Sequence, residues 1–271
     1  LLSDPVMLKI AEDCYWFSVS DGDILLWVQA IAAGYKFDVK VDEPDVSPLQ
    51  TQGPNSTKLM TKVFGDWVSS LPFYRFKEIT HKGIPMIIAR MGYSKELCYE
   101  IFLQDHTRGD ELWEMLWEAG QDLNISPGGP NMILRLEGGI VSYLSDVNRT
   151  NNPFEVGFEA MVDLDQKDDF IGKDALREIY SKGPEKKLMG AEILGDPITE
   201  TNADHWPVVI DGRQIGSMNA LVFSPRLNKN ISYVILDIKH AIKGNEIIIS
   251  SPDQDFKAKL VDLPWLERVK K

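Results

Sequence analysis

The chain has 271 residues, 44% hydrophobic and 26% charged, which are ordinary proportions for a globular protein with a large core and more than one domain. Its formal net charge of −12 disfavours nucleic acid and anionic membrane surfaces as partners, because both select a surplus of Lys and Arg. Two cysteines and four histidines without metal-ligand spacing predict neither a disulfide framework nor a metal site. The low cysteine content favours a reducing cytoplasm as the compartment. No apolar run has the length of a membrane span.

The first elements along the chain are predicted to be two short strands and a helix. The strands are expected over residues 6–10 and 14–19. Asp21-Gly22-Asp23 is expected to cap a helix over residues 24–33, with Gly34 ending it.

A further strand, a loop and a second helix are expected next. Residues 35–41 alternate in character and predict a strand, whereas residues 44–52 predict a loop. Gly53-Pro54-Asn55-Ser56 then opens a helix that continues through Phe64, with apolar residues on one face.

An acidic residue in an apolar strand makes residues 84–102 the most informative stretch. The apolar run 84–89 predicts a buried strand that forms a hairpin with a second strand over residues 98–102. Gly92 breaks the pattern, Tyr93 lies at the mouth of the hairpin, and Glu100 is surrounded by apolar neighbours. A buried carboxylate needs a hydrogen-bond donor, so Glu100 is a candidate ligand-binding residue. The alternative is an outward-facing glutamate on an alternating strand.

A helix that begins after a cap at residues 107–110 carries two tryptophans one turn apart. Apolar residues recur at helical spacing at Leu112, Leu116, Ala119 and Leu123. Trp113 and Trp117 lie on an adjacent face and are interpreted as core or interface aromatics. A homodimer therefore stays open as an alternative to a monomer.

Arg135 stands in an apolar helical stretch that follows a tight break at residues 127–130. An arginine in such a stretch is normally paired, and Glu137 or Glu155 is the expected structural partner. A short helix over residues 173–181 then ends at Gly183, where a domain boundary is placed.

The pattern of apolar and turn-forming residues changes from Lys187 onward. Short apolar runs are separated by Gly, Asn, Asp and Pro, which predicts an antiparallel β module like a barrel or jelly roll. The runs are residues 188–193, 207–210, 231–236, 246–249 and 257–261. With the mixed elements before it, this module places the chain in the α+β class.

Four blocks, in a fixed order, resemble the glycine-cleavage T-protein (aminomethyltransferase) family of folate-dependent one-carbon enzymes. The blocks cover most of the chain: Gly92-Tyr93-Ser94 with Tyr99-Glu100-Ile101; Leu134-Arg135-Leu136-Glu137-Gly138 with Tyr143, Asp146 and residues 152–157; residues 169–176; and residues 212–216 with 223–227. Each block alone is weak evidence for the resemblance, and the four blocks together are strong evidence.

The resemblance implies a multi-domain aminomethyltransferase-like fold that binds tetrahydrofolate. Residues 1–183 would form the folate-binding region as two interleaved subdomains, 1–42 with 131–183 and 43–130. Residues 184–271 would form the C-terminal β-barrel domain.

The resemblance also assigns roles to residues. Glu100 takes the position of the pterin-binding glutamate, where one carboxylate accepts hydrogen bonds from the adjacent N–H and NH2 donors of the pterin. Tyr93 matches a folate-contacting tyrosine. Asp4 matches the acid near the reacting nitrogen, whereas the residues alone make Asp4 a turn or capping residue before Pro5.

Four further residues receive roles by resemblance. Arg135 would be a folate-site residue, and Trp16 takes the position of a site-lining aromatic that contacts cofactor and substrate. Tyr15 and Trp16 together would enclose a sulfonium or ammonium through cation–π attraction. Tyr143 would line the substrate site.

Within the family, the opening of the chain and Gly92-Tyr93-Ser94-Lys95 are most similar to the dimethylsulfoniopropionate demethylase branch. A small-molecule methyl donor is therefore expected, with an aminomethyltransferase or a non-catalytic folate-binding paralogue as alternatives. Leu144 and Ser145 depart from the family's Tyr-Gly-Asn-Asp pattern, and Leu97 and Cys98 depart from a Gly-Gly pair. Relatives carry a further segment before the position of Leu1, which predicts a truncated chain.

Overall fold

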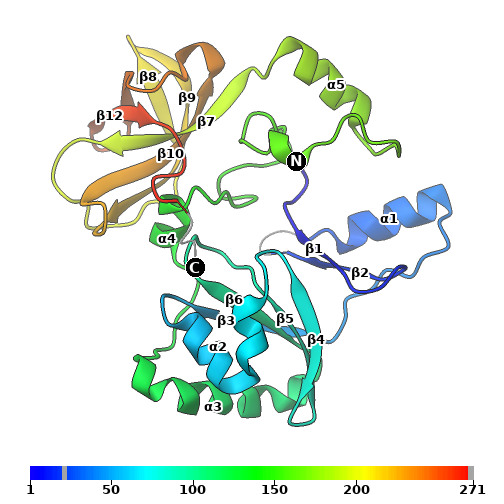
Figure 1. The fold of residues 1–271 in the computed structure, drawn as a ribbon. Helices are drawn as coiled ribbons and strands as arrows, with labels where there is room; N and C mark the ends of the chain where they lie inside the picture. The colour runs from blue at the N-terminus through cyan, green and yellow to red at the C-terminus, as the bar shows by residue number, and fades with distance from the viewer. Residues whose placement is uncertain (20–22, 268–271) are drawn as a thin grey trace. The chain divides into compact units, whose positions relative to one another are not determined.

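The computed structural model describes residues 1–19 and 23–267, which divide into two compact units (Figure 1). The first unit joins Leu1–Ile24 to Met132–Leu266, and Leu25–Asn131 with Glu267 forms the second. The mixture of helices and strands confirms the α+β class. Five short 3-10 helices lie between the main elements: η1 (Asp66–Ser70), η2 (His106–Arg108), η3 (Gln121–Leu123), η4 (Glu159–Met161) and η5 (Ile238–His240).

A closed six-stranded antiparallel barrel dominates the first unit. Its strands are β7 (Lys186–Ile193), β8 (Trp206–Ile210), β9 (Arg213–Ser224), β10 (Lys229–Asp237), β11 (Glu246–Ser250) and β12 (Asp255–Val261). They follow one another around the barrel in the order β10-β7-β12-β11-β8-β9. The predicted β module is confirmed, and closure removes the exposed strand edges of an open sheet. The sequence interpretation missed β9, the longest strand.

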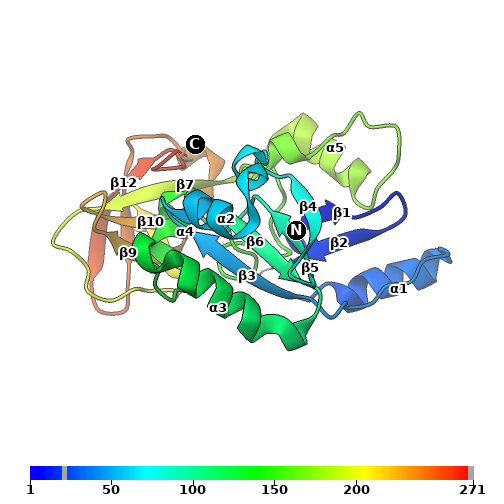
Figure 2. The ribbon, with the colours of Figure 1, turned by 60° about the horizontal axis from the view of Figure 1, so that its bottom comes forward.

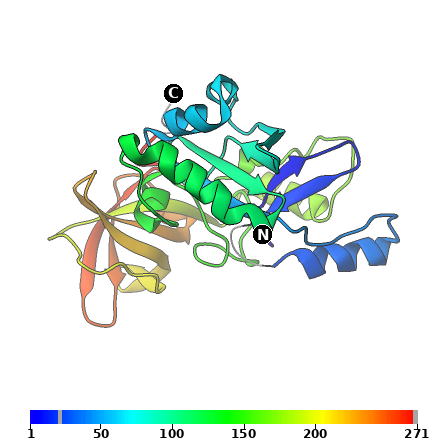
Figure 3. The ribbon, with the colours of Figure 1, turned by 90° about the horizontal axis from the view of Figure 1, so that it is seen from below.

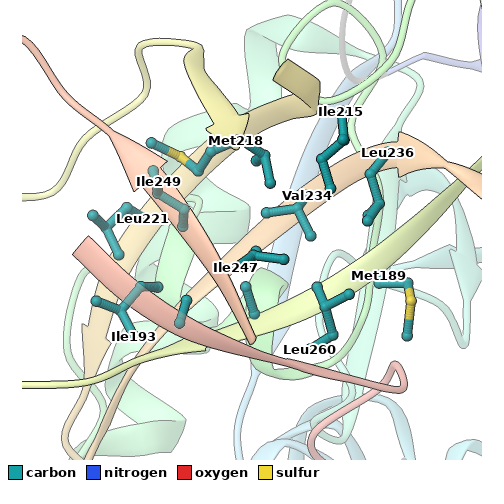
Figure 4. Close-up of a cluster of buried hydrophobic side chains, with 13 residues drawn as sticks. Met189, Ile193, Ile215, Met218, Leu221, Val234, Leu236, Ile247, Ile249 and Leu260 are labelled. Atoms are coloured by element: carbon teal, nitrogen blue, oxygen red, sulfur yellow. The ribbon is translucent and has the colours of Figure 1, made fainter. Parts of the chain in front are cut away.

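Inward-facing aliphatic side chains fill the barrel (Figure 4). They alternate with outward residues along each strand, as the pleat requires, and include Met189, Ile193, Met218, Leu221, Val234, Ile247, Ile249 and Leu260. Gly216 marks a close approach of β9 to β10, since a Cβ there would lie 2.2 Å from the carbonyl oxygen of Ile235.

A second core lies on the outside of the barrel, still within the first unit. The short helix α4 (Met132–Glu137) and the segment that follows it pack against outward residues of β9 and β10. The cluster contains Leu136, Val141, Tyr143, Val147, Val156, Leu188, Ala220, Val222, Ile231, Tyr233 and Ile235. This packing positions Arg135 and Tyr143. The helix α5 (Lys173–Lys182) follows, as predicted.

The first unit also contains the two-stranded hairpin of β1 (Val6–Lys9) and β2 (Tyr15–Ser18). Both strands were predicted. Its register pairs Leu8 with Trp16 and Met7 with Phe17, so these two pairs lie on opposite faces.

The second unit is a four-stranded antiparallel sheet with two helices on one face (Figures 2 and 3). The strand order is β3-β6-β5-β4, with β3 (Ser47–Gln52), β4 (Phe76–His81), β5 (Ile84–Ala89) and β6 (Cys98–Leu103). The helices α2 (Ser56–Phe64) and α3 (Gly109–Gly120) bury Leu59, Met60, Leu112 and Leu116 against the sheet. Both helices and the β5–β6 hairpin were predicted.

The predictions for residues 24–52 need three corrections. The helix α1 (Leu25–Tyr35) runs through Gly34 and ends in a Schellman motif, in which Phe37 N–H donates to Ala32 and Lys36 N–H to Ala33. Lys36, at φ +56°, takes the left-handed position expected of Gly34. Residues 35–41 form no strand, since they have no pairing partner among the described strands. Ser47–Gln52, predicted as loop, is the edge strand β3. The predicted cap at Asp21-Gly22 lies outside the described residues.

The two tryptophans of α3 are not core residues. Their rings stack with centroids 6.4 Å apart, and Trp113 is 41% exposed. The interface interpretation and the homodimer therefore stay predictions. No helix among residues 1–19 and 23–267 is long and apolar enough to cross a membrane.

Candidate functional site

The two faces of the sheet in the second unit carry different chemistry. Side chains that alternate along β5 and β6 face the helices and are fully apolar except for the Tyr99 hydroxyl: Ile84, Met86, Ile88, Tyr99, Ile101 and Leu103. By the same alternation, Cys98, Glu100 and Phe102 point to the opposite face. The carboxyl group of Glu100 is therefore an ionisable group in an otherwise apolar row of β6.

Glu100 has no polar partner within the described part of the chain. Its register neighbours are Ala89 on β5 and Gln50 on β3, and its carboxyl makes no hydrogen bond or ion pair to a described residue. Burial raises the pKa of the Glu100 carboxyl from 4.5 to about 7. A desolvated acid without a donor is what a ligand with N–H groups can stabilise. Glu100 lies on the face of the sheet away from the helices and is half-buried there, so its ligand-binding role stays a prediction beside the outward-facing alternative.

The loop between β5 and β6 contains Gly92 and Tyr93. A Cβ at Gly92 would lie 2.3 Å from Cys98 Sγ and 2.7 Å from Gln50 Nε2, so the loop backbone packs closely on this face of the sheet. Tyr93 follows directly and is half-buried. The structure therefore brings the Tyr93 loop and the Glu100 strand to one face, as the hairpin prediction required.

A chain of hydrogen bonds crosses the same region. Glu96 N–H donates to Ser94 Oγ at 3.2 Å, and Ser94 Oγ donates to Gln52 Oε1 at 2.8 Å. Gln50 Nε2 donates to the same Gln52 oxygen at 3.2 Å. Ser94 is only 3% exposed, which makes it a buried anchor for the two glutamine amides.

Sequence reasoning missed Gln50, Gln52 and Ser94 as site residues. The signal was the alternation Leu49-Gln50-Thr51-Gln52, in which the two glutamines share a face. Pro48 and the polar composition favoured a loop over a strand. Without the strand, Gln50 could not be placed opposite Glu100.

In the first unit, Asp4 lies half-buried just before β1. The buried Oγ of its neighbour Ser3 has no hydrogen-bond partner among the described residues. An orphaned hydroxyl beside the predicted acid is compatible with a ligand there, and the role of Asp4 stays a prediction.

The hairpin does not bring Tyr15 and Trp16 together. Trp16 pairs with Leu8 and is half-buried, whereas Tyr15 pairs with Lys9 on the other face and is 45% exposed. The Lys9 ammonium lies 5.8 Å from the Tyr15 ring centroid. The prediction that Tyr15 and Trp16 together enclose a cation is therefore wrong, because neighbouring residues on a strand point in opposite directions. Their separate roles stay predictions.

Arg135 is 3% exposed and forms a buried ion pair with Asp146, not with Glu137 or Glu155. Asp146 also accepts the Ser142 N–H at 2.7 Å, and the guanidinium lies 5.7 Å from the Tyr233 ring centroid. Burial raises the pKa of the Asp146 carboxyl, and Arg135 opposes that rise. The predicted folate role of Arg135 stays a prediction beside this structural one.

Glu137 is the second buried acid of the first unit, 1% exposed. It accepts hydrogen bonds from Ser224 Oγ at 2.5 Å and from the Arg226 guanidinium, with which it forms an ion pair. Asp146 and Glu137 thus each have an arginine and a second donor, whereas the buried Glu155 accepts hydrogen bonds from the Asn151 side-chain amide and the Asn152 N–H.

Tyr143 is 8% exposed and belongs to the outer core of the barrel. Its role in substrate binding stays a prediction. The next residue, Leu144, is 58% exposed and has φ +70°, a left-handed conformation that favours glycine. The family's pattern has Gly at this position, so Leu144 occupies backbone shaped for another residue.

The described residues contain no group of three or more His, Cys, Asp or Glu side chains able to hold a metal ion.

Comparison with known proteins identifies the family of the chain. The GCVT N-terminal domain matches residues 1–166, and the glycine cleavage T-protein C-terminal barrel domain matches residues 186–267. The dimethylsulfoniopropionate demethylase DmdA of Ruegeria pomeroyi is 39% identical over 253 residues, which are 93% of this chain and 68% of that protein. The chain belongs to the glycine-cleavage T-protein family. Its enzymes transfer one-carbon units to tetrahydrofolate.

Two further relatives are less similar in sequence than this demethylase. The aminomethyltransferase of Alkaliphilus metalliredigens is 32% identical over 274 residues, which are 99% of this chain and 73% of that protein. The crystal structure of the glycine cleavage system aminomethyltransferase T from Bartonella henselae superposes with a TM-score of 0.85 over 99% of this chain and 73% of that one. At 20% identity, this likeness shows the T-protein fold alone.

Proposed function

We propose that the protein transfers a methyl group from a small sulfonium compound, dimethylsulfoniopropionate, to tetrahydrofolate. The observation that carries the proposal is Glu100, a desolvated carboxyl without a partner among the described residues. It supports the folate half of the proposal. The 39% identity to a dimethylsulfoniopropionate demethylase, against 32% to an aminomethyltransferase, supports the donor half.

The residues present fit tetrahydrofolate. Glu100 would accept the two adjacent pterin donors, which a carboxylate can do with both oxygens. Tyr93, on the loop beside Gly92, would offer an apolar ring face and a polar tip to a flat heterocycle. When bound, tetrahydrofolate supplies the nitrogen that accepts the one-carbon unit.

The protein's own contribution would be positioning and proton transfer. A sulfonium methyl is already activated, because a neutral sulfide leaves when the methyl group departs. Binding both reactants in line and excluding water would therefore supply most of the rate enhancement. Asp4 would take the proton that the accepting nitrogen loses, a role that rests on the family resemblance.

Turnover with defined donors tests the proposal. Purified protein, tetrahydrofolate and dimethylsulfoniopropionate are expected to give methyl-tetrahydrofolate, detected by mass spectrometry. Asp4→Asn should lose most of that turnover while still binding tetrahydrofolate. Absence of product from sulfonium, O-methyl and N-methyl donors would overturn the demethylase proposal.

Aminomethyl transfer is the second candidate, because aminomethyltransferases match almost the whole chain. An aminomethyl donor bound to a carrier protein would then give product where dimethylsulfoniopropionate does not. Tight tetrahydrofolate binding without turnover of any donor would instead favour the non-catalytic paralogue, which the strained Leu144 motivates.

A further inference from the structure

Gln50 lies where a ligand held by Glu100 would need a hydrogen-bond donor. The two residues are direct partners in the β3–β6 register and share one face of the sheet. Gln50 is exposed on the edge strand, and its amide also lies against Gly92, next to Tyr93. It is thus adjacent to both predicted folate residues of this unit.

The orientation of the Gln50 amide follows from the hydrogen-bond chain behind it. The chain starts at the backbone N–H of Glu96, which donates to Ser94 Oγ, and the Ser94 hydroxyl donates its own proton to Gln52 Oε1. An oxygen at Gln52 can only accept, so Gln50 must present its nitrogen to it. The nitrogen of Gln50 is therefore held near Gln52, with its second N–H not used.

The remaining polar groups of Gln50 are available. Its second N–H and its Oε1 make no hydrogen bond to a residue within 1–19 or 23–267. A fixed amide with an unused donor beside an unpaired carboxyl offers two acceptors and one donor in a row.

That row complements one kind of heterocycle edge. A 2-amino-4-oxo pyrimidine ring presents NH2, N–H and C=O in sequence, which is two donors followed by one acceptor. We propose that Gln50 contacts the ligand and donates a hydrogen bond to the ring carbonyl, next to the two donors that Glu100 accepts. This inference rests on the proposed function, of which it specifies the ligand edge.

The test measures tetrahydrofolate affinity by calorimetry at pH 8 for unmodified protein, Gln50→Leu, Gln50→Glu and Glu100→Gln. Gln50→Leu should weaken binding about fivefold to tenfold, the scale of one neutral hydrogen bond. Gln50→Glu should weaken it further, because an acceptor would then face the ring carbonyl. Gln121→Leu is the matched control, since it removes an exposed glutamine amide that donates to Trp117 on α3.

Two results would overturn the inference while the proposed function stands. One is Gln50→Leu within twofold of unmodified protein while Glu100→Gln binds weakly. The other is Gln50→Glu that binds as tightly as unmodified protein, which would make residue 50 an acceptor or a bystander. No binding by the unmodified protein overturns the proposed function and this inference with it. Melting temperatures without ligand, expected within about 2 °C for the Gln50 variants, exclude unfolding as the cause.

Discussion

Two buried acids of the first unit, Asp146 and Glu137, differ from Glu100 of the second unit in their partners. Asp146 and Glu137 are each paired with an arginine and accept a further hydrogen bond. Glu100 has neither among the described residues, and burial raises its pKa to about 7. Paired acids hold a fold together, whereas a desolvated acid without a donor costs folding free energy and is best explained by a ligand. The following predictions test this contrast.

The largest effect is expected where a buried pair is broken. Asp146→Ala leaves the Arg135 guanidinium buried without its anion, and should lower the free energy of unfolding by about 3–5 kcal/mol. Urea denaturation measures this. Glu178→Ala is the control, because it removes an exposed acid paired with Lys182 on α5 and should cost well under about 1 kcal/mol. Equal effects of the two substitutions would contradict a structural role for Asp146.

An opposite sign is expected for Glu100→Gln in the absence of ligand. The folded state holds the Glu100 proton more tightly than the unfolded chain, so the native protein loses stability as pH rises from about 4.5 to 7. Glutamine removes that loss. The variant should match unmodified protein at pH 4 and exceed its unfolding free energy by about 1–3 kcal/mol at pH 8.

Thermal or urea denaturation across pH checks this sign. Glu78→Gln is the matched control, because it removes an exposed carboxyl on β4 of the same sheet. A loss of stability for Glu100→Gln at pH 8 would show that Glu100 has a structural partner. It would then not differ from the paired acids of the first unit.

The smallest effect concerns backbone strain beside Asp146. Leu144→Gly relieves an exposed leucine at φ +70° and should raise the free energy of unfolding by about 0.5–1 kcal/mol. Asn228→Gly, at φ +52°, is the control with less to gain, since asparagine tolerates this conformation. Equal changes in unfolding free energy for the two variants would show that the backbone conformation of Leu144 does not destabilise the protein.

The sequence predicted the elements in which local pattern and tertiary packing agree. The β5–β6 hairpin, α2, α3 and the barrel strands other than β9 combine an apolar period with clear turn residues. The prediction failed where strand pairing, and not the local pattern, determines the secondary structure. Residues 35–41 alternate like a strand but have no partner strand in the described chain, and β3 is polar yet pairs with β6.

The candidate site, like the fold, was predicted only in part from the sequence. Glu100 and Tyr93 could be found, because an acid among apolar residues and a family motif are visible in one dimension. The partner of Arg135 could not, since Asp146 reaches it through a turn eleven residues later. Gln50 and the opposite faces of Tyr15 and Trp16 depend on strand register, which the sequence does not display.

The central claim is that Glu100 is kept without a partner for a folate. The most direct measurement is the tetrahydrofolate dissociation constant of Glu100→Gln beside unmodified protein at pH 8. Glutamine places a donor against a ligand donor and removes the charge, so affinity should fall about thirtyfold to a thousandfold, or 2–4 kcal/mol, while the ligand-free protein stays folded. An affinity within threefold of unmodified protein would contradict the account.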